Sequence, residues 1–142
     1  MSAKDWCSKL TFAALEEQGF HVESVEVKGV KGRTKDFMGC FDELAWHLDG
    51  RCYLIQSTER GHIQARRQKI DDALADKNKA EAIKKWIEAE GRHAEIWAWG
   101  CAKGTQLRKM ELLVEYVPVK AVRSRQLTTD VRWAFRWQEV IP

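Results

Sequence analysis

This sequence has little proline and lacks linker-like stretches and closely spaced cysteine pairs, features that would indicate several domains or a zinc-binding protein. Proline occurs only at Pro118 and Pro142, and no serine-rich or glycine-rich stretch divides the 142 residues. We therefore expect a single domain over residues 1–142, without a linker or an internal repeat. The four cysteines lie far apart and form no CxxC pair, which argues against a zinc finger or zinc ribbon.

Long apolar runs and the common nucleotide-binding motifs are missing as well. A membrane-spanning helix needs about 18 or more consecutive apolar residues, and no such run or signal-type leader is present. We therefore expect a cytoplasmic protein with reduced thiols. The phosphate-binding glycine loop, the dinucleotide fingerprint and the GxSxG elbow do not occur either, so nothing indicates a nucleotide-binding protein or a serine hydrolase.

The charge of the chain has a small positive surplus, with a formal net charge of +3 and a pI of about 8.7. Much of the surplus lies in three short clusters, at 66–69, 84–85 and 120–125. Clustered cations bind phosphate better than scattered ones, so the distribution is compatible with a nucleic-acid partner.

Hydrophobic periodicity predicts an α+β fold. The expected helices are an N-terminal one that ends at Gly19, His62–Ala75 and Asn78–Ala89. The expected strands are Phe20–Val27, Phe37–His47, Cys52–Gln56, Ala94–Trp99, Met110–Val117 and Val131–Val140. An antiparallel hairpin followed by a helical crossover requires a mixed sheet with helices packed on it, in the order αβββααβββ.

The dipeptide Asp49-Gly50 predicts a tight hairpin turn between two apolar runs. If those runs pair as antiparallel strands, Asp42 and Gln56 lie at the same end of the hairpin. A glutamine inside an apolar strand needs hydrogen-bond partners, because a buried amide is costly without them. The sequence therefore predicts a polar site where Asp42 and Gln56 meet.

The segment around this hairpin resembles the PD-(D/E)xK nuclease superfamily, in particular the branch of archaeal-type Holliday-junction resolvases. Gly39, Asp42 and Ala45 match the spacing of that branch, and Gln56-Ser57-Thr58 stands where it has Glu-x-Lys. The resemblance covers roughly residues 5 to 100. It implies a restriction-endonuclease-like sheet and a nuclease that hydrolyses phosphodiester bonds of DNA, such as branched recombination or repair DNA, with Mg²⁺ or Mn²⁺ as cofactor. It also implies a possible homodimer.

The resemblance also implies roles for individual residues. Asp42, Gln56 and the Ser57 carbonyl would bind the metal, because Mg²⁺ prefers oxygen ligands. Thr58 would orient the attacking water in place of the family's lysine, with a cation supplied from elsewhere. Asp36 and Glu17 are further candidate carboxylates, and Glu17 shares a helical face with Trp6, Leu10 and Ala13. The candidate DNA-binding cations are Lys35, Arg60, His62, Arg66 and Arg67.

Two other interpretations stay open. Because Gln-x-Thr lacks the charges of Glu-x-Lys, the chain can be a catalytically inactive nuclease fold that binds nucleic acid or protein. It can also be a small phage-type host-takeover or inhibitor protein whose late strands form the partner surface. Trp97, Trp99, Trp133 and Trp137 in those strands would then either pack the sheet or stack on bases and partners.

Overall fold

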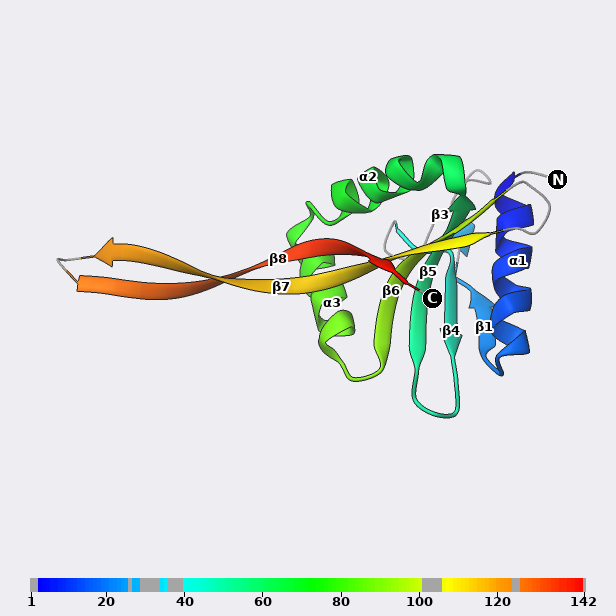
Figure 1. The fold of residues 1–142 in the computed structure, drawn as a ribbon, viewed down its shortest axis with the longest axis horizontal. Coiled ribbons are helices and arrows are strands. Elements are labelled where there is room, and N and C mark those ends of the chain that lie inside the picture. Colours follow the sequence, from blue (N-terminus) through cyan, green and yellow to red (C-terminus); the bar gives the residue numbers. More distant parts are fainter. Residues whose placement is uncertain are drawn as a thin grey trace.

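The computed structural model describes residues 3–25, 27–28, 34–35, 40–100, 106–123 and 126–141. These residues form an α+β fold with one six-stranded mixed sheet and three α-helices (Figure 1). The helices are α1 (Ala3–Glu17), α2 (Ile63–Ala73) and α3 (Lys77–Glu88). The strands of the sheet are β1 (His21–Ser24), β4 (Glu43–Trp46), β5 (Cys52–Glu59), β6 (Arg92–Trp99), β7 (Leu107–Arg123) and β8 (Gln126–Val140).

The strands of the six-stranded sheet lie in the order β1-β4-β5-β6-β7-β8. All neighbours are antiparallel except β5 and β6, which are parallel because α2 and α3 form the crossover between them. The predicted α+β class and the order αβββααβββ are therefore confirmed for this sheet. The sequence did not predict a second, two-stranded sheet, which is formed by β2 (Val27–Lys28) and β3 (Thr34–Lys35).

The predicted hairpin turn joins β4 to β5. Gly50 has a φ of +97°, a conformation that favours glycine, and its N–H donates to the His47 carbonyl. The Asp49 carboxylate accepts a bond of 2.9 Å from the Arg51 N–H and thereby closes the turn. This turn sets the register in which Glu43 faces Ile55, so the neighbouring Asp42 and Gln56 meet as predicted.

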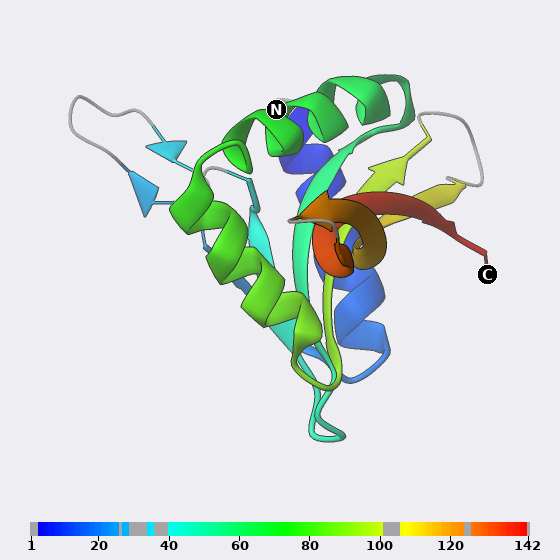
Figure 2. The ribbon, with the colours of Figure 1, turned by 90° about the vertical axis from the view of Figure 1, so that its left-hand side faces the viewer.

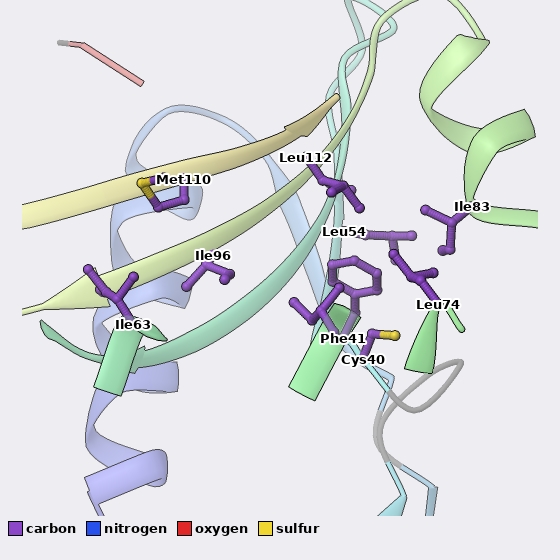
Figure 3. Packing of buried hydrophobic residues seen from close by; sticks show 12 residues of the cluster. Cys40, Phe41, Leu54, Ile63, Leu74, Ile83, Ile96, Met110 and Leu112 are labelled. Carbon is purple, nitrogen blue, oxygen red and sulfur yellow. The ribbon is translucent and has the colours of Figure 1, made fainter. Parts of the chain in front are cut away.

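The helices cover both faces of the sheet, with α1 on one face and α2 and α3 on the other (Figure 2). The core on the α2–α3 face consists of Cys40, Phe41, Leu54, Ile63, Ile70, Leu74, Ile83, Ala94, Ile96, Ala98, Met110 and Leu112 (Figure 3). The core on the α1 face consists of Cys7, Leu15, Phe20, Val22, Ala45, Ile55, Trp97 and Trp99. No helix within the described ranges is long and apolar enough to cross a membrane.

Strands β7 and β8 continue far beyond the helices as a twisted two-stranded ribbon (Figure 1). Its base is tied to the helices, because Trp137 Nε1 donates a 3.0 Å bond to Asp71 Oδ1 and the Tyr116 hydroxyl donates to Glu88. The predicted strands Met110–Val117 and Val131–Val140 were too short. Pro118 and the charged residues after it weaken the strand pattern, but a two-stranded ribbon tolerates proline because both of its strands are edge strands.

Candidate functional site

The predicted polar site lies where β4 begins and β5 approaches its end. Asp42 Oδ2 accepts a bond of 2.9 Å from Gln56 Nε2 and one of 3.2 Å from the Ser57 backbone N–H. Thr58 continues the same strand, and its hydroxyl accepts a 3.4 Å bond from Arg66 Nε on α2. We call Asp42, Gln56, Ser57 and Thr58 the Asp42 centre. The structure thus brings together four of the residues that the sequence singled out.

A second chain of hydrogen bonds runs from this centre through to the α1 face of the sheet. Ser57 Oγ donates a bond of 2.8 Å to Glu43 Oε1, so its only proton is used there. The Thr11 hydroxyl, 2.8 Å from Ser57 Oγ, must then donate to it, and Thr11 accepts a 2.9 Å bond from Trp99 Nε1. The donors therefore point in one direction, from Trp99 towards the Glu43 carboxylate.

The Asp42 centre is closed to solvent. Asp42 is 1% exposed, Gln56 0% and Thr58 3%. A carboxylate removed from water needs hydrogen-bond donors in its place, and here the Gln56 amide and the Ser57 N–H provide them. In this conformation neither water nor a DNA phosphate reaches the Asp42 side chain.

The arrangement of the Asp42 centre does not fit a divalent metal ion. Mg²⁺ binds oxygen atoms, but Gln56 turns its amide nitrogen towards Asp42. The same Nε2 atom lies 3.5 Å from the Ser57 carbonyl oxygen. The amide would have to rotate by half a turn before its oxygen could join Asp42 as a ligand. Gln56 Oε1 is buried and has no hydrogen-bond partner among the described residues.

The candidate cations lie in different surroundings. Arg66 is half-buried, and its Nε donates a 3.4 Å bond to Thr58 Oγ1. Arg60 is exposed and donates a 3.0 Å bond to Gln106 Oε1, while His62 is exposed at the start of α2. The Arg67 guanidinium lies 5.9 Å from the centre of the Trp137 ring, against the base of the ribbon.

The expectation that Glu17 points towards the site is wrong, because the Glu17 side chain is exposed at the C-terminal end of α1. The helix buries Cys7, Thr11 and Leu15 against the sheet, so the inward stripe runs one position away from the one predicted. Thr11 is therefore the residue that α1 contributes to the network. Asp36 and the Lys35 side chain lie outside the described part of the chain, as does Gly39.

Sequence reasoning also missed two groups of polar residues. Glu43 is 1% exposed and was overlooked. Because it follows Asp42 directly and side chains alternate along a strand, its side chain was expected on the face opposite to that of Asp42. The second group is His93, Glu95 and Glu111, whose candidate ligand atoms all lie within 4.8 Å of one another. His93 and Glu95 alternate along β6, a weak signal, and Glu111 joins them only through the pairing of β6 with β7.

This second group, which we call the His93 cluster, differs from the Asp42 centre in its access to water. The side chains of His93 and Glu111 are 33% and 24% exposed and are joined by a 2.8 Å hydrogen bond. Glu95 is buried, and burial raises its pKa above the ordinary value for a glutamate. The facing Glu111 carboxylate adds to this rise in pKa, while the Trp97 N–H and Lys109 oppose it.

The tryptophans of β6 belong to the core. Trp97 is 1% exposed and Trp99 7%, so neither ring can stack on a base in this conformation. The interpretation of Trp97 and Trp99 as sheet packing is therefore confirmed. Trp133 and Trp137 are half-buried on the ribbon, where Trp133 packs edge-on against Phe135.

A comparison with known proteins finds no matching family model, no matching curated protein and no matching solved structure.

Proposed function

We propose that this chain is a DNA-binding protein of nuclease type in which the Asp42 centre stabilises the fold and does not hydrolyse phosphodiesters. The observation that supports a structural and not a catalytic role for the Asp42 centre is the bond from the Gln56 amide to Asp42 Oδ2. It places an uncharged internal donor where a metal ion would have to bind. The near-complete burial of Asp42, Gln56 and Thr58 points the same way, because a substrate phosphate must reach the reacting groups.

The ribbon supports the assignment of DNA as the partner. Its distal strand segments, residues 119–123 and 126–130, contain two basic residues, Lys120 and Arg123, against one acidic residue, Asp130. The major groove of B-DNA, about 12 Å wide, admits a two-stranded β-ribbon, and lysine and arginine provide the phosphate contacts that give affinity. A ribbon that extends away from the helices can enter a groove while the rest of the protein stays outside it (Figure 1).

The proposal places the protein in the cytoplasm, where DNA and reduced thiols are found together. In the described part of the chain Cys7 and Cys40 are buried, and Cys52 is a free thiol. A homodimer, as in resolvase-like proteins, would present two ribbons to one DNA molecule.

Metal-dependent hydrolysis of DNA is the second candidate function, and one observation favours it. Arg66 Nε lies 3.4 Å from Thr58 Oγ1 and so provides a positive charge beside the residue that replaces the family's lysine. This function requires a second conformation, with the Gln56 amide reversed and the centre open to solvent. Asp42, Gln56 and the Ser57 carbonyl would then bind Mg²⁺ or Mn²⁺.

The two candidates are separated by assays on branched, duplex and single-stranded DNA with Mg²⁺ or Mn²⁺, using wild type and Asp42→Asn. We expect no cleavage by either protein, together with salt-dependent binding by both. Replacing Lys120 and Arg123 together with glutamine should lower the slope of log affinity against log salt by about 2, at roughly 0.9 per lost phosphate contact. Replacing Lys77, which is exposed on α3, together with Lys79, which is half-buried there, is the matched control and should leave binding unchanged.

Metal-dependent cleavage that Asp42→Asn abolishes would overturn the proposal in favour of the second candidate. If wild type neither binds nor cleaves any of the three DNA forms, both candidates are wrong, and a protein partner becomes the next hypothesis to test.

A further inference from the structure

We propose that His93, Glu95 and Glu111 form a binding site for one divalent transition-metal ion, with Zn²⁺ as the best match. This site is separate from the Asp42 centre and goes beyond the proposed DNA binding. Its three side chains come from the adjacent strands β6 and β7 and lie on the α1 face of the sheet. The candidate ligand atoms, one from each residue, all lie within 4.8 Å of one another.

The backbone of the sheet positions these side chains. Glu95 and Glu111 are direct partners in the antiparallel pairing of β6 with β7, so their side chains project from the same face side by side. His93 precedes Glu95 by two residues and therefore projects from that face as well. Two regular strands hold all three ligands, and no loop has to fold around an ion to bring them together.

A bound cation would stabilise the two facing carboxylates of this cluster. Like charges directly opposite each other destabilise an antiparallel pair of strands, and one of these two carboxylates is only 4% exposed. Trp97 Nε1 donates a 2.9 Å bond to Glu95 Oε1, the one hydrogen bond that the described residues give this carboxylate. One hydrogen bond offsets little of the free-energy cost of burying a carboxylate. By contrast, the Oδ2 atom of Asp42 alone accepts two hydrogen bonds.

The donor atoms indicate the kind of ion. One imidazole nitrogen and two carboxylate oxygens form a ligand set that suits Zn²⁺ and related transition metals, whereas Mg²⁺ and Ca²⁺ prefer oxygen alone. Ligands on a tetrahedral Zn²⁺ lie roughly 3.3 Å apart, since each bond is about 2.0 Å long. The His93–Glu111 contact of 2.8 Å is shorter than this value and the upper limit of 4.8 Å is longer, so the ligand atoms have to shift by about 1.5 Å or less. The partial exposure of His93 and Glu111 leaves the remaining coordination position to water.

Neighbouring side chains restrict the movement of the ligands. The Tyr53 ring stacks on the His93 ring at 4.7 Å between centroids, and Trp86 Nε1 donates a 3.1 Å bond to the His93 carbonyl. Such surrounding contacts orient ligands in metal sites. Lys109 is the cation that competes for this region, but its Nζ lies 4.0 Å from the centre of the Trp97 ring and so faces the ring.

The test is a titration of the purified full-length chain with Zn²⁺ against a chromophoric chelator, without DNA, so that the result is independent of the proposed function. We expect wild type to bind one Zn²⁺ per chain and Glu95→Gln to bind at least about tenfold more weakly, as even the loss of an outer partner costs about tenfold. The matched control Glu115→Gln removes an exposed glutamate from β7, the strand that carries Glu111, and should bind as wild type does.

Glu95→Gln keeps an oxygen that can accept the Trp97 N–H, so we expect it to fold, which circular dichroism checks. A second measurement follows the Trp97 indole N–H in ¹⁵N-correlated NMR spectra, where Zn²⁺ should shift this resonance in wild type and in Glu115→Gln but not in Glu95→Gln. Absence of Zn²⁺ binding to folded wild type, or equal affinity in folded Glu95→Gln, would overturn the proposal.

Discussion

Two clusters of acidic side chains lie on the same sheet and solve the same electrostatic problem differently. In the Asp42 centre the carboxylate is surrounded by internal donors, the Gln56 amide and the Ser57 N–H. In the His93 cluster two carboxylates face each other, and a half-exposed histidine is bonded to one of them. The comparison teaches that burial alone does not mark a metal site, because what matters is which groups already occupy the carboxylate oxygens.

The two clusters also lie at different positions along the strands. The Asp42 centre is near the end of β5, next to the start of α2, whereas His93 pairs with Tyr53 close to the β4–β5 turn. The closed position suits a structural network, since water would weaken its hydrogen bonds. The more open position suits reversible binding of an ion from solution.

The largest expected effect comes from removing the acceptor of the Asp42 centre. Asp42→Ala leaves the Gln56 amide and the Ser57 N–H buried without their acceptor, and we expect a loss of about 3 kcal/mol in the free energy of unfolding. Urea unfolding followed by circular dichroism measures this. Asp72→Ala, at an exposed position on α2, is the control and should cost far less. A loss at Asp42 as small as that of the control would mean that the centre does not stabilise the fold.

A smaller effect is expected at the other end of the same network. Thr11→Val has nearly the same shape but removes the hydroxyl that bonds Ser57 and Trp99, and should cost about 1–2 kcal/mol of unfolding free energy. Glu16→Ala, exposed on the same helix, is the control. If thermal and urea unfolding show no difference between Thr11→Val and wild type, the network ends at Ser57 and does not include α1.

The smallest effect, and one of opposite sign, is expected at Glu95. Because its pKa is raised in the folded protein, the unfolded chain releases this proton at lower pH, so stability falls as pH rises from the ordinary glutamate pKa through the raised value. Without metal, Glu95→Gln should therefore be more stable than wild type at neutral pH and nearly equal to it at pH about 4, near the ordinary glutamate pKa.

Urea unfolding of wild type and Glu95→Gln across this pH range, with a chelator present, gives the comparison. A variant that is less stable than wild type at neutral pH would show that the Glu95 charge is well compensated inside the protein, and the motive for a cation there would disappear.

Local signals in the sequence predicted much of the fold and half of the site. The Asp49-Gly50 turn and the apolar runs beside it set the hairpin register, and this placed Asp42 next to Gln56. The orientation of Glu17 was wrong because docking on the sheet decides which face of α1 is buried, and the apolar stripe was too broad to show it.

The His93 cluster could not be predicted, because it depends on a pairing between strands. Glu95 and Glu111 are distant in sequence, and only the register of β6 with β7 brings them together. The distal ribbon was missed for a related reason, since its two strands pair with each other and Pro118 interrupts the strand pattern of β7.

The most direct test of the contrast between the two clusters is the Zn²⁺ affinity of three folded proteins measured side by side: wild type, Asp42→Asn and Glu95→Gln. We predict that Asp42→Asn binds Zn²⁺ as wild type does and that Glu95→Gln loses most of its affinity. Loss of Zn²⁺ binding in Asp42→Asn, with binding retained in Glu95→Gln, would contradict it and would identify the Asp42 centre as the metal site.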